Sequence, residues 1–281
     1  MKYCILIIIG LFQLSFALQS ATSVETQKQW IDLDTMDQQT RLATLRDHVF
    51  VHSSHFPPLY QAADDLQKLF SLAGINAIGL FGCTLGILRM GECLPWDDDI
   101  DYGVDIRDEH KIKALIPLAN KLGYNLFADD IVGYKFYRKE QIVDPDTKKP
   151  HHVFVDIFLY QFDDDKYQLV REKGRKLFPK AWLSKRDFET RTVLKCGPLK
   201  MPCSAYTREL LFKFYGDECE TKALFYFSHI KDVKTFYKWT IRPTDGHFSL
   251  KDIRLKDRIT EELLPSMSFD DWQNFTRKLT E

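Results

Sequence analysis

FGCTLGILRMGECLPWDDDID, residues 81–101, carries most of the information on the fold of this chain. The residues that lead into it, 75–81, are apolar and bounded by glycines, which predicts a short buried strand. Gly82 opens a turn, and Cys83-Thr84 begins a short helix whose free N–H groups can hold phosphate oxygens. We expect Thr84 either to cap this helix or to bind phosphate directly.

Arg89 follows about a turn and a half along the predicted helix. We interpret it as a contact to the phosphate of a donor, and a surface salt bridge is the alternative. A glycine-led turn is weak evidence by itself. A strand, a glycine turn and a helix placed just ahead of paired aspartates are a stronger indication of a phosphate site.

Asp99 and Asp101 are the paired acids at the end of this stretch. In an extended strand, side chains two residues apart point to the same face, so the two carboxylates converge while Ile100 and Tyr102 anchor the opposite face in the core. A divalent cation relieves the repulsion between the carboxylates. Oxygen ligands suit Mg²⁺ or Mn²⁺ better than zinc. A solvated acidic loop and a calcium-binding turn are the alternatives.

Asp156 supplies a third acid, within the apolar segment HVFVDIFL at residues 152–159. A single carboxylate in such a strand is costly to bury unless it is paired or bound to metal. We therefore predict that Asp156 is the third metal ligand and the base that takes the acceptor hydroxyl's proton. A salt bridge to a buried Arg or Lys is the alternative. His152 shares the strand face, and we assign it no role.

Helical and strand patterns alternate along the rest of the chain, which predicts one mixed α/β domain. The expected order is a polar stem over 21–34, helices over 35–49, 59–74 and 107–122, strands over 133–138 and 153–160, a polar turn over 142–150, a helix over 204–214 and a short helix from Ser268.

The first residues read as a targeting signal, because Lys2 precedes an apolar run from Cys4 to Leu18. The run is short for a membrane span and suits a signal peptide, with an uncleaved signal anchor as the alternative. Either reading sends the chain into the secretory pathway, to the lumen of the ER or Golgi, as a secreted or type II anchored protein. The predicted divisions are 1–18 signal, 19–50 stem and leading helix, 51–245 catalytic domain and 246–281 C-terminal extension.

Cysteine content and net charge indicate the compartment and the partners of this chain. A lumenal compartment permits disulfides, and Cys196 and Cys203 are the preferred pair. Asn274-Phe275-Thr276 is a glycosylation sequon. Lys plus Arg (39) and Asp plus Glu (40) leave a net charge of -1, so no basic surface for a nucleic acid is indicated. Membrane contact is expected only through the N-terminal anchor.

These motifs resemble the LicD and fukutin-related family of phospho-sugar and phosphocholine transferases. The resemblance rests on Gly82, Gly86, Arg89, Gly91 and Pro95-Trp96-Asp97-Asp98-Asp99-Ile100-Asp101, with support from the Asp156 strand and from Phe214-Tyr215-Gly216. It covers roughly residues 60–220. The family usually has Thr at the position of Cys83 and His at the position of Met90. Neither departure removes an expected metal ligand, so we expect activity.

The resemblance implies a nucleotidyltransferase-type fold, a mixed sheet with helices packed against it and further helical segments at both ends. It implies a divalent metal at Asp99, Asp101 and Asp156, and a CDP-linked donor whose phospho-alcohol group, of the phosphocholine or ribitol-phosphate type, passes to a glycan or glycolipid hydroxyl with release of CMP. Asp97 either holds the loop or contacts the donor, and Trp96 either packs or stacks on a base. The full expected donor site is Gly82, Cys83, Thr84, Arg89, Trp96, Asp97 and Asp98.

Two other functions fit parts of the pattern. A glycosyltransferase with an Asp-x-Asp metal site would also be lumenal and nucleotide-dependent, but it predicts neither the glycine-turn helix nor a third acidic strand. A catalytically inactive binding module of the same fold is kept open by Cys83 and Met90. Donor screening separates the first alternative, and metal binding without turnover would indicate the second.

Overall fold

A mixed seven-stranded sheet is the centre of the computed structural model, which describes residues 30–231, 233–242 and 253–258. Its main path runs β10-β9-β8-β3-β2, and β5 pairs with β8 and carries β4 on its far side. β3 and β8 are parallel, whereas β2 runs antiparallel to β3. The sheet strands are β2 (Ala77–Leu80), β3 (Asp99–Asp105), β4 (Tyr124–Ala128), β5 (Gly133–Arg138), β8 (Phe154–Asp163), β9 (Lys166–Leu169) and β10 (Leu183–Ser184).

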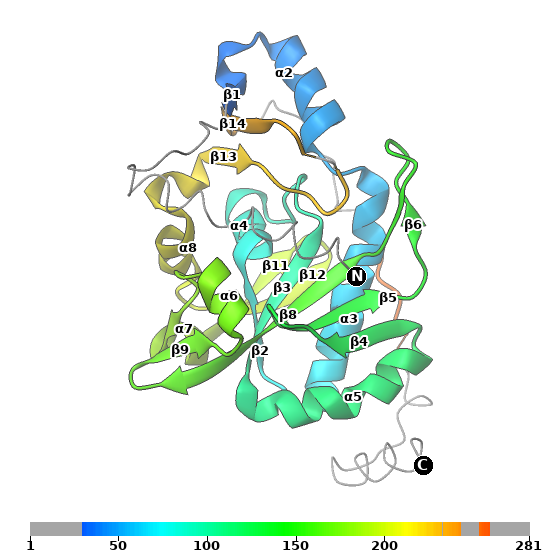
Figure 1. Ribbon diagram of the computed structural model, residues 1–281, viewed down its shortest axis with the longest axis vertical. Helices are drawn as coiled ribbons and strands as arrows, with labels where there is room; N and C mark the ends of the chain where they lie inside the picture. Colours follow the sequence, from blue (N-terminus) through cyan, green and yellow to red (C-terminus); the bar gives the residue numbers. More distant parts are fainter. Residues whose placement is uncertain (1–29, 232, 243–252, 259–281) are drawn as a thin grey trace.

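Helices α3 (Phe56–Leu72) and α5 (Glu109–Lys121) pack on the sheet (Figure 1) and share the largest core with its apolar side chains. Ile100 and Tyr102 of β3 are completely buried in that core. The alternation of the strand therefore turns the aspartates of β3 away from it, as expected. Gly74, with φ of 61°, follows the end of α3, because glycine accepts the left-handed conformation that ends a helix.

Helix α4 (Phe81–Met90) joins β2 to the acidic strand β3 and packs against α8 (Thr207–Tyr215). It begins at Phe81, two residues before the expected start. Phe81 has φ of 53°, a strained conformation for a residue with a side chain. Its ring is held among the rings of Phe158, Phe178 and Phe214, at centroid distances of 5.1, 6.0 and 5.1 Å, and this packing compensates the strain.

A small sheet joins the start of the described chain to strands from its later part, at the top of Figure 1. β1 (Trp30–Asp32) lies parallel to β14 (Phe236–Thr240), which pairs with β13 (Lys222–Phe225). The prediction of a polar stem up to Asp34 is thus wrong for residues 30–34. The helix expected over 35–49 is divided into α2 (Gln38–Thr44) and a π-helical turn, Leu45–Val49.

The remaining elements are short. They include the β6–β7 hairpin (Ile142–Val143 and Pro150–His151) where a polar turn was expected, α6 (Glu172–Leu177), α7 (Lys185–Glu189) and the β11–β12 hairpin (Arg191–Cys196 and Leu199–Ser204). The signal segment, the helix from Ser268, the sequon and most of the C-terminal extension lie outside the described residues. Within the described ranges, no helix has both the length and the apolar character to cross a membrane.

The predicted pairing of Cys196 with Cys203 is wrong. The two residues lie in opposite strands of the β11–β12 hairpin, but Cys196 faces Leu199 and Cys203 faces Thr192. They are therefore several residue pairs apart along the ladder. All five described cysteines are buried free thiols.

Candidate active site

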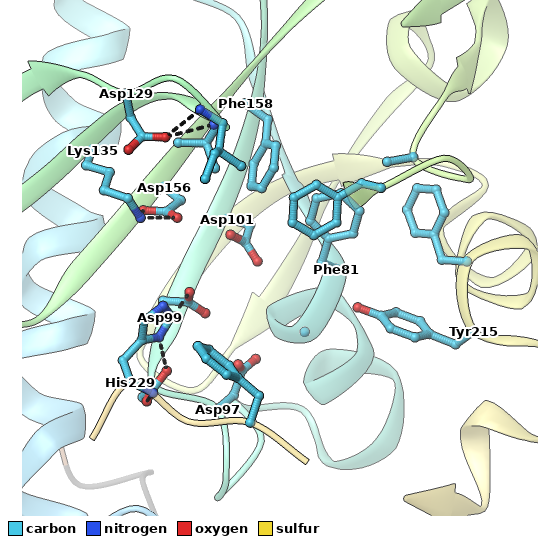
Figure 2. A pocket seen from close by; sticks show the side chains of 18 of the residues that line it. Phe81, Asp97, Asp99, Asp101, Asp129, Lys135, Asp156, Phe158, Tyr215 and His229 are labelled. Atoms are coloured by element: carbon cyan, nitrogen blue, oxygen red, sulfur yellow. Dashed lines mark hydrogen bonds and ion pairs between the residues drawn. The ribbon is translucent and has the colours of Figure 1, made fainter. Parts of the chain in front are cut away.

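Three carboxylates converge at one end of the parallel strands β3 and β8. The register places Asp101 directly opposite Asp156, and Asp99 lies two residues before Asp101 on the same face. One oxygen from each of Asp99, Asp101 and Asp156 lies within 4.8 Å of the others. Figure 2 shows the three carboxylates pointing into one cavity. The structure thus brings together all three acids that were predicted to share a metal ion.

Burial and mutual repulsion raise the pKa values of two of these acids, Asp99 and Asp101. Burial, opposed by His229 but supported by the charges of Asp98 and Asp156, raises the pKa of Asp99 to about 6. Burial and the charges of Asp99 and Asp156 raise the pKa of Asp101 well above its usual range. The donor set consists of carboxylate oxygens, which is the chemistry that Mg²⁺ or Mn²⁺ requires. The residues present therefore fit the implied ion.

Lys135 of β5 is a cation within the cluster that the sequence analysis missed. Its Nζ donates to both oxygens of Asp156, at 2.8 and 2.7 Å, and both side chains are largely buried. The salt bridge considered as an alternative role for Asp156 therefore exists alongside its convergence with the other acids. A cation that binds Asp156 must share its oxygens with this lysine.

Asp97 points into the cavity beside the start of α4. Its Oδ2 is buried without a hydrogen-bond partner, and burial together with the charges of Asp99 and Asp98 raises the pKa of Asp97 well above its usual range. A Cβ atom on Gly82 would lie 2.0 Å from that oxygen. Glycine is therefore required at position 82 for the close approach of α4 to this carboxylate. Gly82 and Asp97, two of the residues predicted to bind the donor, both line the cavity.

Asp98 fastens a segment that the sequence analysis did not place at the site. Its carboxylate accepts hydrogen bonds from the Ser228 hydroxyl at 2.9 Å and from the His229 backbone N–H at 2.7 Å, and contacts His229 Nδ1 at 2.8 Å. Burial opposes ionisation, but the charge and hydrogen bond of His229 outweigh it and hold the pKa of Asp98 below its usual range. Asp98 therefore orders residues 226–231 against the cavity, which it also lines.

Four of the predicted donor residues do not line the cavity. Arg89 donates through Nε to the Cys219 carbonyl at 2.7 Å and through Nη2 to the Lys222 carbonyl at 2.5 Å, so it ties α4 to β13. Trp96 packs between Phe50 and Trp239, at ring distances of 6.2 and 4.9 Å. In this structure Arg89 and Trp96 thus make packing and backbone contacts away from the cavity, and their predicted roles in donor binding stay predictions.

Cys83 and Thr84 are the other two predicted donor residues that do not line the cavity. Cys83 is completely buried, and its sulfur contacts the Leu80 carbonyl at 3.0 Å and the Met201 sulfur at 3.7 Å. The Thr84 hydroxyl donates to the Phe81 carbonyl at 2.9 Å within α4. Neither side chain lines the cavity, and Thr84 does not cap the helix. The reason is the early start of α4, which turns both residues into the protein.

The far part of the cavity combines a loop that the sequence did not single out with Tyr215, from the Phe214-Tyr215-Gly216 segment that supported the resemblance. Lys180, in the loop after α6, adds a second lysine, and Tyr215 closes the aromatic wall. In Figure 2 the rings of Phe81, Phe158 and Tyr215 lie opposite the side that carries Asp156 and Lys135. His152, to which no role was assigned, contacts the Arg138 carbonyl at 2.9 Å and is structural.

Residues 77–195 match the family model described as LicD/FKTN/FKRP, nucleotidyltransferase domain. This part of the chain is therefore a LicD-family domain, as the motifs indicated. The mixed sheet with its packed helices has the expected nucleotidyltransferase-like fold.

Two curated relatives are uncharacterized proteins of Rickettsia prowazekii (strain Madrid E) and Rickettsia typhi (strain ATCC VR-144 / Wilmington). Each is 27% identical over 119 residues, which is 42% of this chain and 42% and 37% of the respective relative. The chain thus spans less than half the length of the relatives it matches.

Two solved structures show a weak likeness. The crystal structure of ANT(2")-Ia in complex with adenylyl-2"-tobramycin has a TM-score of 0.27 and 15% identity, over 38% of this chain and 53% of that one. The solution structure of the antibiotic-resistance factor ANT(2'')-Ia has a TM-score of 0.24 and 15% identity, over 48% and 54%. Similarity this low supports no argument about function.

Proposed function

We propose that this chain is a metal-dependent phosphotransferase that moves a phospho-alcohol group from a CDP-linked donor to a glycan or glycolipid hydroxyl in the secretory pathway. The observation that carries the proposal is the convergence of Asp99, Asp101 and Asp156 inside a LicD-family domain. Phosphoryl transfer requires positive charge beside the non-bridging oxygens, and clustered carboxylates provide the means to hold it.

In the proposed reaction, Asp99, Asp101 and Asp156 would hold Mg²⁺ or Mn²⁺, which would supply positive charge beside the phosphate oxygens. The acceptor hydroxyl oxygen forms a bond to the phosphorus next to the transferred alcohol. The bond from that phosphorus to the CMP oxygen breaks, and CMP leaves. Asp156 takes the hydroxyl proton, with Lys135 holding its carboxylate in position.

The cavity offers complementary surfaces for such a donor. Lys135 and Lys180 bring positive charge to a site otherwise dominated by carboxylates, and Gly82 exposes the start of α4 to the same space. The aromatic wall formed by Phe81, Phe158 and Tyr215 suits the planar or apolar part of the substrate. Charged groups thus belong at one end and apolar groups at the other.

The position of Cys83 and Met90 favours an active enzyme over an inactive binding module. Cys83 packs in the core beneath α4, and Met90 packs against a separate apolar cluster with Leu85, Leu94 and Leu211. Neither residue lines the cavity. The two departures from the family pattern therefore leave the proposed site unchanged.

The test is a donor panel with the purified full chain and Mg²⁺. We expect CMP release from CDP-linked alcohols such as CDP-choline or CDP-ribitol, and none from UDP- or GDP-sugars. Turnover of the sugar nucleotides alone would favour the Asp-x-Asp glycosyltransferase. Metal binding without turnover of any donor would favour the inactive module. Mass spectrometry of glycans from cells with and without the chain then identifies the transferred group as a missing phosphodiester-linked mass.

A further inference from the structure

Two buried cysteines meet behind the loop that leads to the acidic strand. Cys93 lies in the loop between α4 and β3, and Cys196 ends β11. Their sulfur atoms are 3.9 Å apart, and the two side chains are 1% and 0% exposed. Hydrogen bonds hold the neighbouring backbone on both sides, from Gly197 N–H to the Gly91 carbonyl at 2.7 Å and from Cys93 N–H to the Tyr60 hydroxyl at 2.9 Å. The two thiols therefore face each other within an ordered frame.

We propose that Cys93 and Cys196 form a structural disulfide when the chain folds in the presence of a thiol–disulfide exchange oxidant. The thiols of Cys93 and Cys196 react with one oxidant disulfide. The Cys93–Cys196 S–S bond forms, the S–S bond of the oxidant breaks, and its two sulfurs leave as thiols that carry the two protons. A disulfide requires the sulfurs to approach to about 2.05 Å. The present separation of 3.9 Å can be closed by side-chain rotation and a small shift of the loop between α4 and β3.

The other described cysteines are placed less well for this bond. The sulfur of Cys83 contacts the Leu80 carbonyl and the Met201 sulfur. Cys203 opposes Thr192, far along the hairpin from Cys196. Cys219 belongs to a different apolar cluster, beside Leu85 and Leu211. Geometry thus selects Cys93 as the partner of Cys196.

The bond would connect the acidic loop to the β11–β12 hairpin. Cys93 precedes the run Asp97-Asp98-Asp99 by only a few residues, so the link would fix the loop that delivers the carboxylates to the cavity. It would also close a covalent loop of roughly 100 residues, and long loops of this kind restrict the unfolded chain strongly. The expected consequence is a higher melting temperature for the oxidised protein.

The experiment uses the full chain refolded in a glutathione and glutathione-disulfide buffer. Free thiols are blocked with an alkylating reagent in denaturant, so that the buried cysteines react, before unreduced digestion, and the peptides are identified by mass spectrometry. We expect a linked pair of peptides that contain Cys93 and Cys196, while Cys203 is recovered alkylated. Reduction should separate the pair and lower the melting temperature by several degrees.

Matched variants locate the bond. Cys93→Ala and Cys196→Ala should each abolish the linked peptide and the stability difference between oxidised and reduced protein. Cys203→Ala, a comparably buried control on the next strand, should keep both. Recovery of Cys93 and Cys196 as alkylated thiols in folded wild-type protein, or a link from either one to another cysteine, would overturn the proposal. The wild-type peptide map decides the matter even if a variant does not fold, and it is independent of any transferase activity.

Discussion

At the scale of single residues, the contact between Lys135 and Asp156 affects metal binding, because the lysine occupies the oxygens that a cation would use. Without a bound metal, the Lys135 ammonium compensates the charge of Asp156 on β8. Burial tends to lower the pKa of Lys135, but the charge and hydrogen bonds of Asp156 outweigh it and raise that pKa. The lysine thus serves as a stand-in for part of the positive charge that a divalent ion would bring.

Removing this lysine should make folding depend on metal. We predict that Lys135→Ala lowers the unfolding free energy of metal-free protein by about 3 kcal/mol, because it leaves a buried carboxylate unpaired. Saturating Mg²⁺ should restore most of that loss, as measured by urea denaturation with and without the ion. Lys139→Ala, which removes an exposed lysine, is the control and should change stability by less than about 0.5 kcal/mol. An equal loss of unfolding free energy with and without Mg²⁺ would contradict the inference that Lys135 and the metal ion share the oxygens of Asp156.

Asp99 gives the site a pH dependence of defined sign. Because its folded pKa is raised to about 6, its contribution to stability is present below the ordinary carboxyl pKa and is lost as pH rises through about 6. A bound cation favours the ionised form. The Mg²⁺-induced rise in melting temperature should therefore grow from about pH 5 to about pH 7. Asp99→Asn should flatten this dependence. A wild-type shift that is constant with pH would count against metal binding by these acids.

At the scale of elements, helix α4 meets the acidic loop through Gly82. We predict that Gly82→Ala lowers turnover at least about tenfold, because the added Cβ would displace the Asp97 carboxylate. Cys83→Ala is the neighbouring control. Its side chain packs in the core, so it should reduce stability by about 1 kcal/mol and leave donor KM unchanged. Steady-state kinetics and denaturant unfolding separate the two effects. Normal turnover in Gly82→Ala would show that the approach of α4 to Asp97 is unimportant.

Arg89 connects α4 to the segment that begins the small N- and C-terminal sheet. Arg89→Ala should cost about 2 kcal/mol of unfolding free energy, since two backbone carbonyls lose a charged donor. Donor KM should stay within about twofold of wild type. A large rise in donor KM at unchanged stability would return Arg89 to the donor-binding role that its sequence position first indicated.

At the scale of the whole molecule, the elements with strong local patterns were predictable. The strand over 133–138 has the expected bounds, and the strand with Asp156 begins one residue later than expected. Alternation within a strand also sufficed to place Asp99 and Asp101 on one face, and the parallel register then brought them to Asp156.

Long-range contacts explain what could not be predicted. His229 reaches the site only because Asp98 binds it from a distant part of the sequence, and β1 pairs with β14 near the other end of the described chain. No local residue spacing in the sequence predicts such contacts. The contacts of Arg89 were not predicted because its position along α4 was known but the direction of its side chain depended on β13.

Substitution of Asp99, Asp101 and Asp156 gives the most direct test of the proposed metal site. CMP release from the best CDP-linked donor should fall by at least about a hundredfold in each of Asp99→Asn, Asp101→Asn and Asp156→Asn, while the proteins stay folded. Asp105→Asn, on the same strand but bound to Arg107 outside the cavity, should retain nearly full turnover. Wild-type rates of CMP release in all three variants would contradict the account.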